Sequence, residues 1–211
     1  MLVASIGFTV DFIIRRLADL RGGQSVSRVV AVGLDVGDGS WSRVEQTYSL
    51  LNHYLASMSI DSTLEKLHLG PRLVPQARDL IYREASSFDG DVELYLSGGP
   101  RMLIVTLMLA AYSLDINTSS KIVVVSYGEG FPGSIEFRLI HAKILSSLDK
   151  QSLTILKAIA SGNDNVKSLI ETLDMPRSTL YKKLEDLEKM GLAKKISRGR
   201  WVLEEGLDKL L

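Results

Sequence analysis

Basic and hydroxyl side chains gather in two short stretches near the C-terminal end of the sequence. The first stretch carries five side chains that can meet bases or phosphates: Arg177, Ser178, Thr179, Tyr181 and Lys182. The second stretch carries four cations: Lys194, Lys195, Arg198 and Arg200. Cations bind phosphates, while arginine, lysine and hydroxyl groups can also hydrogen-bond base edges in the major groove. The two stretches therefore indicate contacts with double-stranded DNA.

Two consecutive segments show helical periodicity, and the first of these stretches lies in the second segment. One apolar stripe consists of Leu169, Ile170 and Leu173, and the next consists of Leu180, Leu184, Leu187 and Met190. A turn at 174–176 separates them, Pro176 marks the start of the second helix, and Gly191 is its expected left-handed stop. The strip 193–203 then predicts two short strands around a basic tip at 197–199. This order predicts a winged helix-turn-helix, whose second helix reads bases while the strand pair holds phosphates.

Two alternatives to DNA binding stay open for this segment. It could be a helical hairpin whose charges are merely solvated, or a winged helix used only for protein contacts. The formal net charge is +0 over 211 residues, so the molecule as a whole does not attract polyanions. Any affinity for DNA must therefore come from the local basic cluster.

Composition excludes several other classes of protein. The chain has 45% hydrophobic residues, which fits one large or two smaller globular domains, and it has no cysteine, which removes disulfides and thiol chemistry. Its three histidines show no ligand spacing, so we expect no metal site. The first residues lack the features of a signal peptide, and the apolar run 102–114 is shorter than the ~20 residues of a membrane span. We expect a cytoplasmic protein with no membrane partner.

The first two thirds of the chain alternate apolar runs of strand length with helical periodicities. Strands are expected at 2–6, 29–34, 63–69, 92–96, 121–126 and 135–139, with helices at 10–20, 43–58, 75–87 and 100–114. This pattern is typical of a parallel sheet flanked by helices. The fold class is therefore α/β, with a Rossmann-like parallel-sheet domain at 1–140 and a mostly α winged helix-turn-helix domain at 150–211. Asp149 is the expected N-cap of the second domain, after a linker at 141–149.

Candidate ligand-binding residues follow the strands of the first domain, because ligands of open parallel sheets bind outside the carboxyl ends of the strands. They are Gly7, Phe8 and Thr9 after the first strand, Asp35 at the end of the second, Ser97, Gly98, Gly99, Pro100, Arg101 and Met102 after the fourth, and the segment 126–129 after the fifth. Glycines at 98 and 99 would let a ligand approach backbone N–H groups, and the helix after them favours an anion. These turns also fit tight strand-to-helix connections, and Asp35 fits either a ribose-binding carboxylate or a turn residue.

Several catalytic motifs are missing. The sequence has no Walker phosphate loop, no Gly-x-Gly-x-x-Gly fingerprint, no Gly-x-Ser-x-Gly elbow and no carboxylate cluster with metal spacing. Without these motifs, the sequence gives no support for ATP hydrolysis or dehydrogenase chemistry. We therefore expect a protein that is not an enzyme, with no catalytic residues and no cofactor other than a regulatory ligand.

The arrangement resembles CRISPR-associated regulators in which a Rossmann-like sensory domain, the CARF domain, precedes a winged helix-turn-helix. The resemblance is carried by the segment 6–9, the turn 96–101 and the winged helix at 166–203, and it covers nearly the whole chain. It looks like the archaeal type I-A members of that group. The resemblance implies a homodimer whose sensory domains together cup a cyclic oligoadenylate, cyclic tetra-adenylate in particular. It also implies transcription regulation of CRISPR operons in antiviral defence.

Some related sensory domains cleave the cyclic ligand with hydroxyl and basic residues near the same loops. Here Ser97 replaces the threonine often seen, and Arg101 stands near where a lysine is often found. The expected function is thus a ligand-responsive, DNA-binding regulator, with a ring nuclease that carries a DNA-binding domain as the first alternative. An adaptor whose winged helix binds protein is the second. A ring of four phosphates suits a site built twice across a dimer axis, and the helix at 102–114 fits either core or dimer face.

Overall fold

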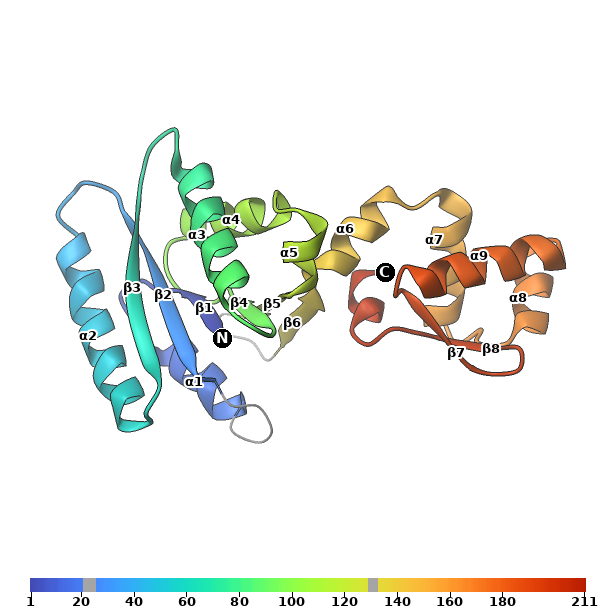
Figure 1. Ribbon diagram of the computed structural model, residues 1–211, viewed down its shortest axis with the longest axis horizontal. Coiled ribbons are helices and arrows are strands. Elements are labelled where there is room, and N and C mark those ends of the chain that lie inside the picture. The colour runs from blue at the N-terminus through green and yellow to red at the C-terminus, as the bar shows by residue number, and fades with distance from the viewer. Residues whose placement is uncertain (21–25, 129–132) are drawn as a thin grey trace. The chain divides into compact units, whose positions relative to one another are not determined.

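The computed structural model describes residues 1–20, 26–128 and 133–211. They form two compact units, Met1–Leu139 and Ile140–Leu211 (Figure 1). Glu129, in the segment expected at the sheet edge, lies outside the described residues. No helix among the described residues is long and apolar enough to cross a membrane.

The first unit is built on a six-stranded sheet of order β3-β2-β1-β4-β5-β6. Its strands are β1 (Leu2–Ser5), β2 (Arg28–Asp35), β3 (Asp61–His68), β4 (Val92–Tyr95), β5 (Ile122–Tyr127) and β6 (Ser134–Arg138). The first five run parallel, which confirms the Rossmann-like class. β6 instead pairs antiparallel with β5, with Tyr127 opposite Ser134. Only residues 128–133 join these two strands, whereas a parallel crossover needs roughly a dozen residues or more.

Helices cover both faces of this sheet (Figure 1). They are α1 (Asp11–Leu20), α2 (Trp41–Ser57), α3 (Leu73–Ser87), α4 (Arg101–Tyr112) and the short α5 (Ile116–Ser120). Leu2 and Ala4 of β1 belong to the core beneath α1 and α2, whereas Val3 belongs to the core beneath α3 and α4. Side chains of a strand alternate between faces, so a strand covered on both sides must be apolar throughout. This explains the continuous apolar runs of the central strands.

The second unit is a small helical bundle with a strand pair. Its elements are α6 (Leu139–Ser147), which starts at the last residue of the first unit, α7 (Lys150–Ala160), α8 (Val166–Leu173), α9 (Arg177–Lys189), β7 (Ala193–Ser197), β8 (Arg200–Leu203) and a 3-10 turn at Leu207–Leu210. Leu169, Leu180, Leu184 and Trp201 are among its fully buried side chains. The apolar stripes that the sequence predicted for α8 and α9 therefore meet in one core.

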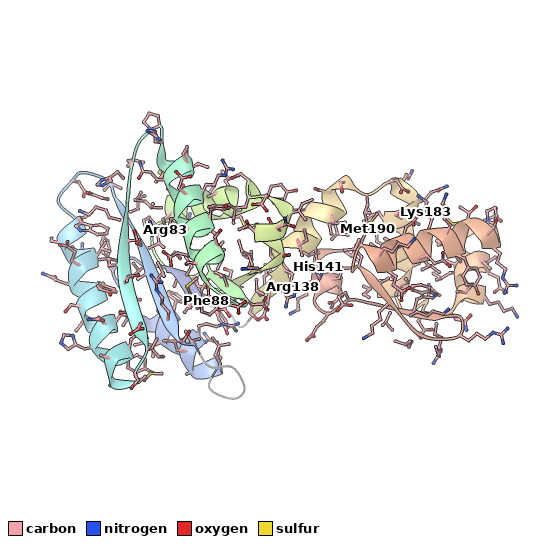
Figure 2. All side chains as sticks on the ribbon, viewed as in Figure 1. Arg83, Phe88, Arg138, His141, Lys183 and Met190 are labelled. Atoms are coloured by element: carbon pink, nitrogen blue, oxygen red, sulfur yellow. The ribbon has the colours of Figure 1, made fainter. Side chains whose placement is uncertain are left out.

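The start of α7 agrees with the sequence, but the segment before it does not. Asp149 is the N-cap of α7, because its carboxylate accepts hydrogen bonds from Ser152 N at 3.0 Å and Ser152 Oγ at 2.8 Å. Lys183 of α9, labelled in Figure 2, also lies 2.7 Å from this carboxylate. The expected linker at 141–149 is wrong as far as Ser147, since α6 occupies it. Ile144 and Leu148 of this segment pack against the second core, which favours a helix over an extended tether.

Candidate functional site

A pocket of about 570 Å³ opens at the carboxyl ends of β1, β2 and β4. The chain leaves β1 for the sheet face that α1 covers and leaves β4 for the opposite face, so the pocket lies where the strand order reverses. Ligands of open α/β sheets bind at this kind of position. The loops at 7–9 and 98–100, which the sequence suggested as ligand-binding loops, both line the pocket. Helices departing to opposite faces therefore leave room for a pocket that is lined by the two glycine-containing loops.

The glycines of these loops allow the loops to touch each other. A Cβ atom on Gly7 would lie 2.7 Å from Gly99 Cα, and one on Gly98 would lie 2.8 Å from Ser5 O. Gly99 has a left-handed φ of +81°, and its Cβ would lie 2.8 Å from Ile6 O. Gly98 and Gly99 line the pocket, so their role toward a ligand stays a prediction, and the structure shows a second reason for glycine at both positions. Their missing side chains make room for main chain, and the two loops form a close-packed pocket floor.

Two other candidates are engaged in local structure. Ser97 is buried, and its Oγ accepts a hydrogen bond from Tyr127 N at 2.8 Å, which ties the end of β4 to β5. Asp35 accepts a hydrogen bond from Gly37 N at 3.0 Å, and its other oxygen lies 3.6 Å from Lys66 Nζ. Neither side chain is in the pocket lining. For Asp35, the structure agrees with the turn alternative and not with the ribose-binding one.

Arg101 and Met102 begin α4 and are exposed, but they also lie outside the lining of this pocket. Pro100 is the N-cap residue of α4, and its carbonyl accepts the first intrahelical bond from Leu103 N at 2.9 Å. The amides at the start of a helix have no intrahelical partner and carry the positive end of the helix dipole. The positive end of the α4 dipole therefore lies beside Pro100 at the edge of the pocket and favours an anion there.

A further wall of the pocket comes from the turn after β2 and the first turn of α2. Asp38, Ser40 and Arg43 line it. Asp38 accepts a hydrogen bond from Ser40 N at 2.9 Å, and hydrogen bonding from Ser40 lowers the pKa of the Asp38 carboxyl below its ordinary value. The Arg43 guanidinium carbon lies 4.1 Å from the centroid of the Phe8 ring, which is 53% exposed. A cation and an aromatic face in one cavity, next to the start of a helix, fit a ligand that combines phosphates with planar bases.

Sequence reasoning missed this wall. Arg43 follows no strand directly, because the turn 36–40 separates it from β2. A usable signal was nevertheless present, since β2 is parallel to β1 and the helix after it must start at the same sheet edge. Among the described residues, no cluster of three His, Asp or Glu side chains is placed to hold a metal ion.

The candidate DNA-reading helix has one buried and one open face. Leu180, Leu184 and Leu187 are buried, whereas Arg177, Ser178 and Lys182 are exposed. Thr179 and Tyr181 are half-buried, and the Arg177 guanidinium carbon lies 5.6 Å from the centroid of the Tyr181 ring. The tight turn before α9 depends on Asp174, which adopts a left-handed φ of 46° at the end of α8. The N-terminal side chains of α9 are therefore presented to solvent by a packed turn.

The strand pair after α9 forms the predicted wing. β7 and β8 run antiparallel, Gly191 has φ +68° after α9, and Gly199 has φ +76° at the tip. Lys194, Lys195 and Arg198 are exposed. Arg200 is also exposed, but its Nε lies 3.6 Å from Asp164 Oδ2, so it supports the loop before α8 as well as the wing. The wing thus carries three lysine or arginine side chains without a carboxylate partner within the described residues.

Comparison with known protein families shows which family the chain belongs to. Residues 1–138 match the family described as the Csa3 CRISPR-associated Rossmann-like domain. The chain belongs to the Csa3 family. Residues 149–195 match a second family, described as bacterial regulatory protein, arsR family. No curated protein matches the chain.

The two matches together identify a CRISPR-associated DNA-binding regulator. The Csa3 domain contains the whole pocket, and the ArsR-type segment contains α7, α8, α9 and the start of the wing. They confirm the resemblance to regulators with a sensory domain and a winged helix-turn-helix. The ArsR-type match ends at Lys195, so the wing tip rests on the structure alone.

Proposed function

We propose that this Csa3-family chain is a cytoplasmic transcription regulator of CRISPR-Cas genes whose DNA binding responds to a cyclic oligoadenylate, cyclic tetra-adenylate in particular. The observation that carries the proposal is the pocket at the reversal of strand order, where Arg43 and an exposed Phe8 ring line one cavity beside the start of α4. Its volume of about 570 Å³ is in the range of ligand sites and suits one part of a nucleotide ring.

An exposed apolar stripe on α4 supports a homodimer. Met102, Val105 and Leu109 are 53%, 57% and 54% exposed, and Tyr112 continues the same face of the helix. A contiguous apolar surface of this kind marks an interaction site. The stripe begins at the helix end that carries the pocket loop, so a second copy packed on it would bring its own loop nearby. A ring with repeated phosphates could then be shared by two identical half-sites.

The exposed start of α9 supports operator reading by the winged helix. In the proposed complex Arg177, Ser178, Thr179, Tyr181 and Lys182 meet base edges, while Lys194, Lys195, Arg198 and Arg200 hold phosphates. Ligand and DNA are coupled through the dimer, and by linkage each must change the affinity of the other by the same factor. The relevant couplings are typically ~1–3 kcal/mol.

Ring cleavage is the alternative that we do not favour. Ser97 is 2% exposed and its Oγ is held by Tyr127 N, so this hydroxyl is poorly placed to attack a phosphodiester. Thr9 is exposed in the pocket, but no histidine or lysine is in the pocket lining to activate it. The site is therefore better suited to binding than to catalysis.

The test is a pair of titrations with the full chain at one salt concentration. Cyclic tetra-adenylate is titrated calorimetrically with and without saturating operator DNA, and operator DNA is titrated with and without saturating ligand. We expect a reciprocal change of affinity and an intact ring afterwards by chromatography. Linear products would support the nuclease alternative. Identical curves in each pair would show that ligand does not control DNA affinity.

A further inference from the structure

Arg43 is the arginine of the pocket lining and has both an aromatic neighbour and unused donors, whereas Arg15, which lies 5.1 Å from the Tyr127 ring centroid, is outside that lining. Arg43 lines the pocket and its guanidinium stacks on Phe8 at 4.1 Å. Within residues 1–20, 26–128 and 133–211, its guanidinium has no hydrogen bond and no ion pair. By contrast, Arg16 donates to Glu93 at 2.7 and 2.6 Å, and Lys66, which lies over the Trp41 ring, has Asp35 Oδ2 at 3.6 Å. Arg43 is therefore a pre-oriented cation whose guanidinium N–H groups have no acceptor among the described residues.

Stacking leaves the useful part of this side chain available. A guanidinium that lies on an aromatic ring uses its face, while its five N–H groups radiate in its plane. The pairing also restricts the rotamers of a long side chain, so less entropy is lost when an anion binds. A phosphate oxygen pair matches the fork of N–H donors, which a lysine cannot reproduce. The Phe8–Arg43 pair is thus suited to phosphodiester recognition.

The sequence of β2 fixes where Arg43 stands. A Cβ atom on Gly33 would lie 2.8 Å from Trp41 Cζ3 and 2.9 Å from Val44 Cγ1. The bare glycine lets the first turn of α2 rest directly on β2. Trp41 is further held by its indole N–H, which donates to Glu45 at 2.7 Å. The guanidinium therefore projects from a packed helix start and not from a loose loop.

We propose that Arg43, oriented by the Phe8 ring, is the specificity-determining phosphate-binding side chain of this pocket and binds one phosphodiester of an oligonucleotide ligand bidentately. This inference rests on the proposed function in so far as the ligand is an oligoadenylate. It assigns the main side-chain contact with phosphate to α2, whereas Arg101, outside the pocket lining, is not required for it.

The test measures ligand affinity calorimetrically for the wild-type chain and four variants: Arg43→Ala, Arg43→Lys, Phe8→Leu and Arg78→Ala. The ligands are cyclic tetra-adenylate, cyclic hexa-adenylate and linear tetra-adenylate. Arg78 is exposed on α3, which covers the opposite face of the sheet, and serves as the matched loss of one positive charge. Thermal melting checks that each variant is folded.

We expect Arg43→Ala to weaken binding roughly 10- to 100-fold, as for loss of a charge-assisted hydrogen bond. Arg43→Lys should recover only part of this loss, because charge returns without the fork geometry. Phe8→Leu keeps an apolar side chain but removes the ring face, so it should weaken binding by about threefold to tenfold. Arg78→Ala should bind like the wild type.

The outcomes separate this inference from the proposed function. Wild-type binding of cyclic tetra-adenylate that survives Arg43→Ala unchanged would overturn the role of Arg43 alone. Binding of another of the three ligands in its place, lost in Arg43→Ala, would support Arg43 and overturn the choice of cyclic tetra-adenylate. Full rescue by Arg43→Lys would overturn the bidentate geometry. If the wild type binds none of the three, both proposals fail.

Discussion

The candidate DNA-binding surface is made of side chains, whereas the floor of the pocket is made of main chain. On α9 and the wing, side chains such as Arg177, Lys182 and Arg198 are exposed, while other residues of the same elements pack in the core of the second unit. In the pocket floor, Gly7 and Gly99 bring main chain against main chain. Surface substitutions usually change stability by less than about 0.5 kcal/mol, whereas overpacked positions lose more. Changes on the wing should therefore affect binding first, and changes in the floor should affect folding first.

The largest effect is expected from Gly99→Val. A branched side chain at φ +81° would meet Ile6 O, so the free energy of unfolding should fall by about 4 kcal/mol. Urea unfolding followed by circular dichroism measures it. Thr9→Val, at an exposed position of the neighbouring loop, is the control and should change little. An unchanged unfolding midpoint for Gly99→Val would remove the contrast between floor and surface.

Buried and exposed ion pairs give the next contrast. Arg16 and Glu93 are 10% and 13% exposed, whereas Lys183 and Asp149 are 25% and 52% exposed. Glu93→Gln removes the nearer carboxylate of a mostly buried guanidinium, leaves it only Glu136 at 3.4 Å, and should cost about 3 kcal/mol. Lys183→Ala should cost less than about 1 kcal/mol. Denaturant unfolding of both variants tests this, and equal losses would contradict the distinction.

Substitutions on the DNA-binding surface should distinguish side chains that recognise the base sequence from side chains that bind phosphates. Arg177→Ala should reduce discrimination between operator and random DNA by about 1–3 kcal/mol, because in the proposed complex Arg177 meets base edges. Arg198→Ala should weaken both complexes equally and reduce the salt slope by about one unit. Fluorescence anisotropy at several salt concentrations measures both quantities. A normal salt slope in Arg198→Ala, with DNA binding retained, would exclude the wing tip from phosphate contact.

The smallest effect concerns acid stability at the start of α7. The hydrogen bonds of Lys183 and Ser152 hold the pKa of Asp149 below its ordinary value. Such a group stabilises the fold above its unfolded pKa of about 3.9, and the contribution is lost as pH falls through the folded value. Asp149→Asn should therefore lower stability at pH 7 by about 0.5 kcal/mol, because it can still cap the helix. The difference from wild type should shrink in unfolding measurements below about pH 3.

Local signals made the winged helix readable from sequence. Asp149, Pro176 and Gly191 each mark a helix boundary within a few residues of the apolar stripe that they delimit. The antiparallel direction of β6 and the short α5 were harder to predict. α5 has five residues, too few for a helical period to show, and its cap at Asp115 becomes visible through the 2.9 Å bond from Thr118 N.

The pocket was only partly predictable, because its walls come from segments far apart in the chain. Parallel strands place the loops after β1 and β4 at one edge, and that much followed from the pattern. Whether a particular side chain at that edge faces the cavity depends on packing. Ser97 turns to Tyr127 N, while Arg43 reaches Phe8 from the next helix. The spacing of residues in the sequence does not predict the directions in which these two side chains point.

The contact between Gly7 and Gly99 also bears on how a protein with such a pocket could diverge. Neither position accepts even one methyl group without displacing backbone, so neither offers a gradual route to a new ligand preference. Phe8 and Arg43 are exposed at the rim, where mutations can accumulate without loss of the fold. New ligand preferences in descendants of this protein should therefore arise at the rim, on an inherited floor that stays the same.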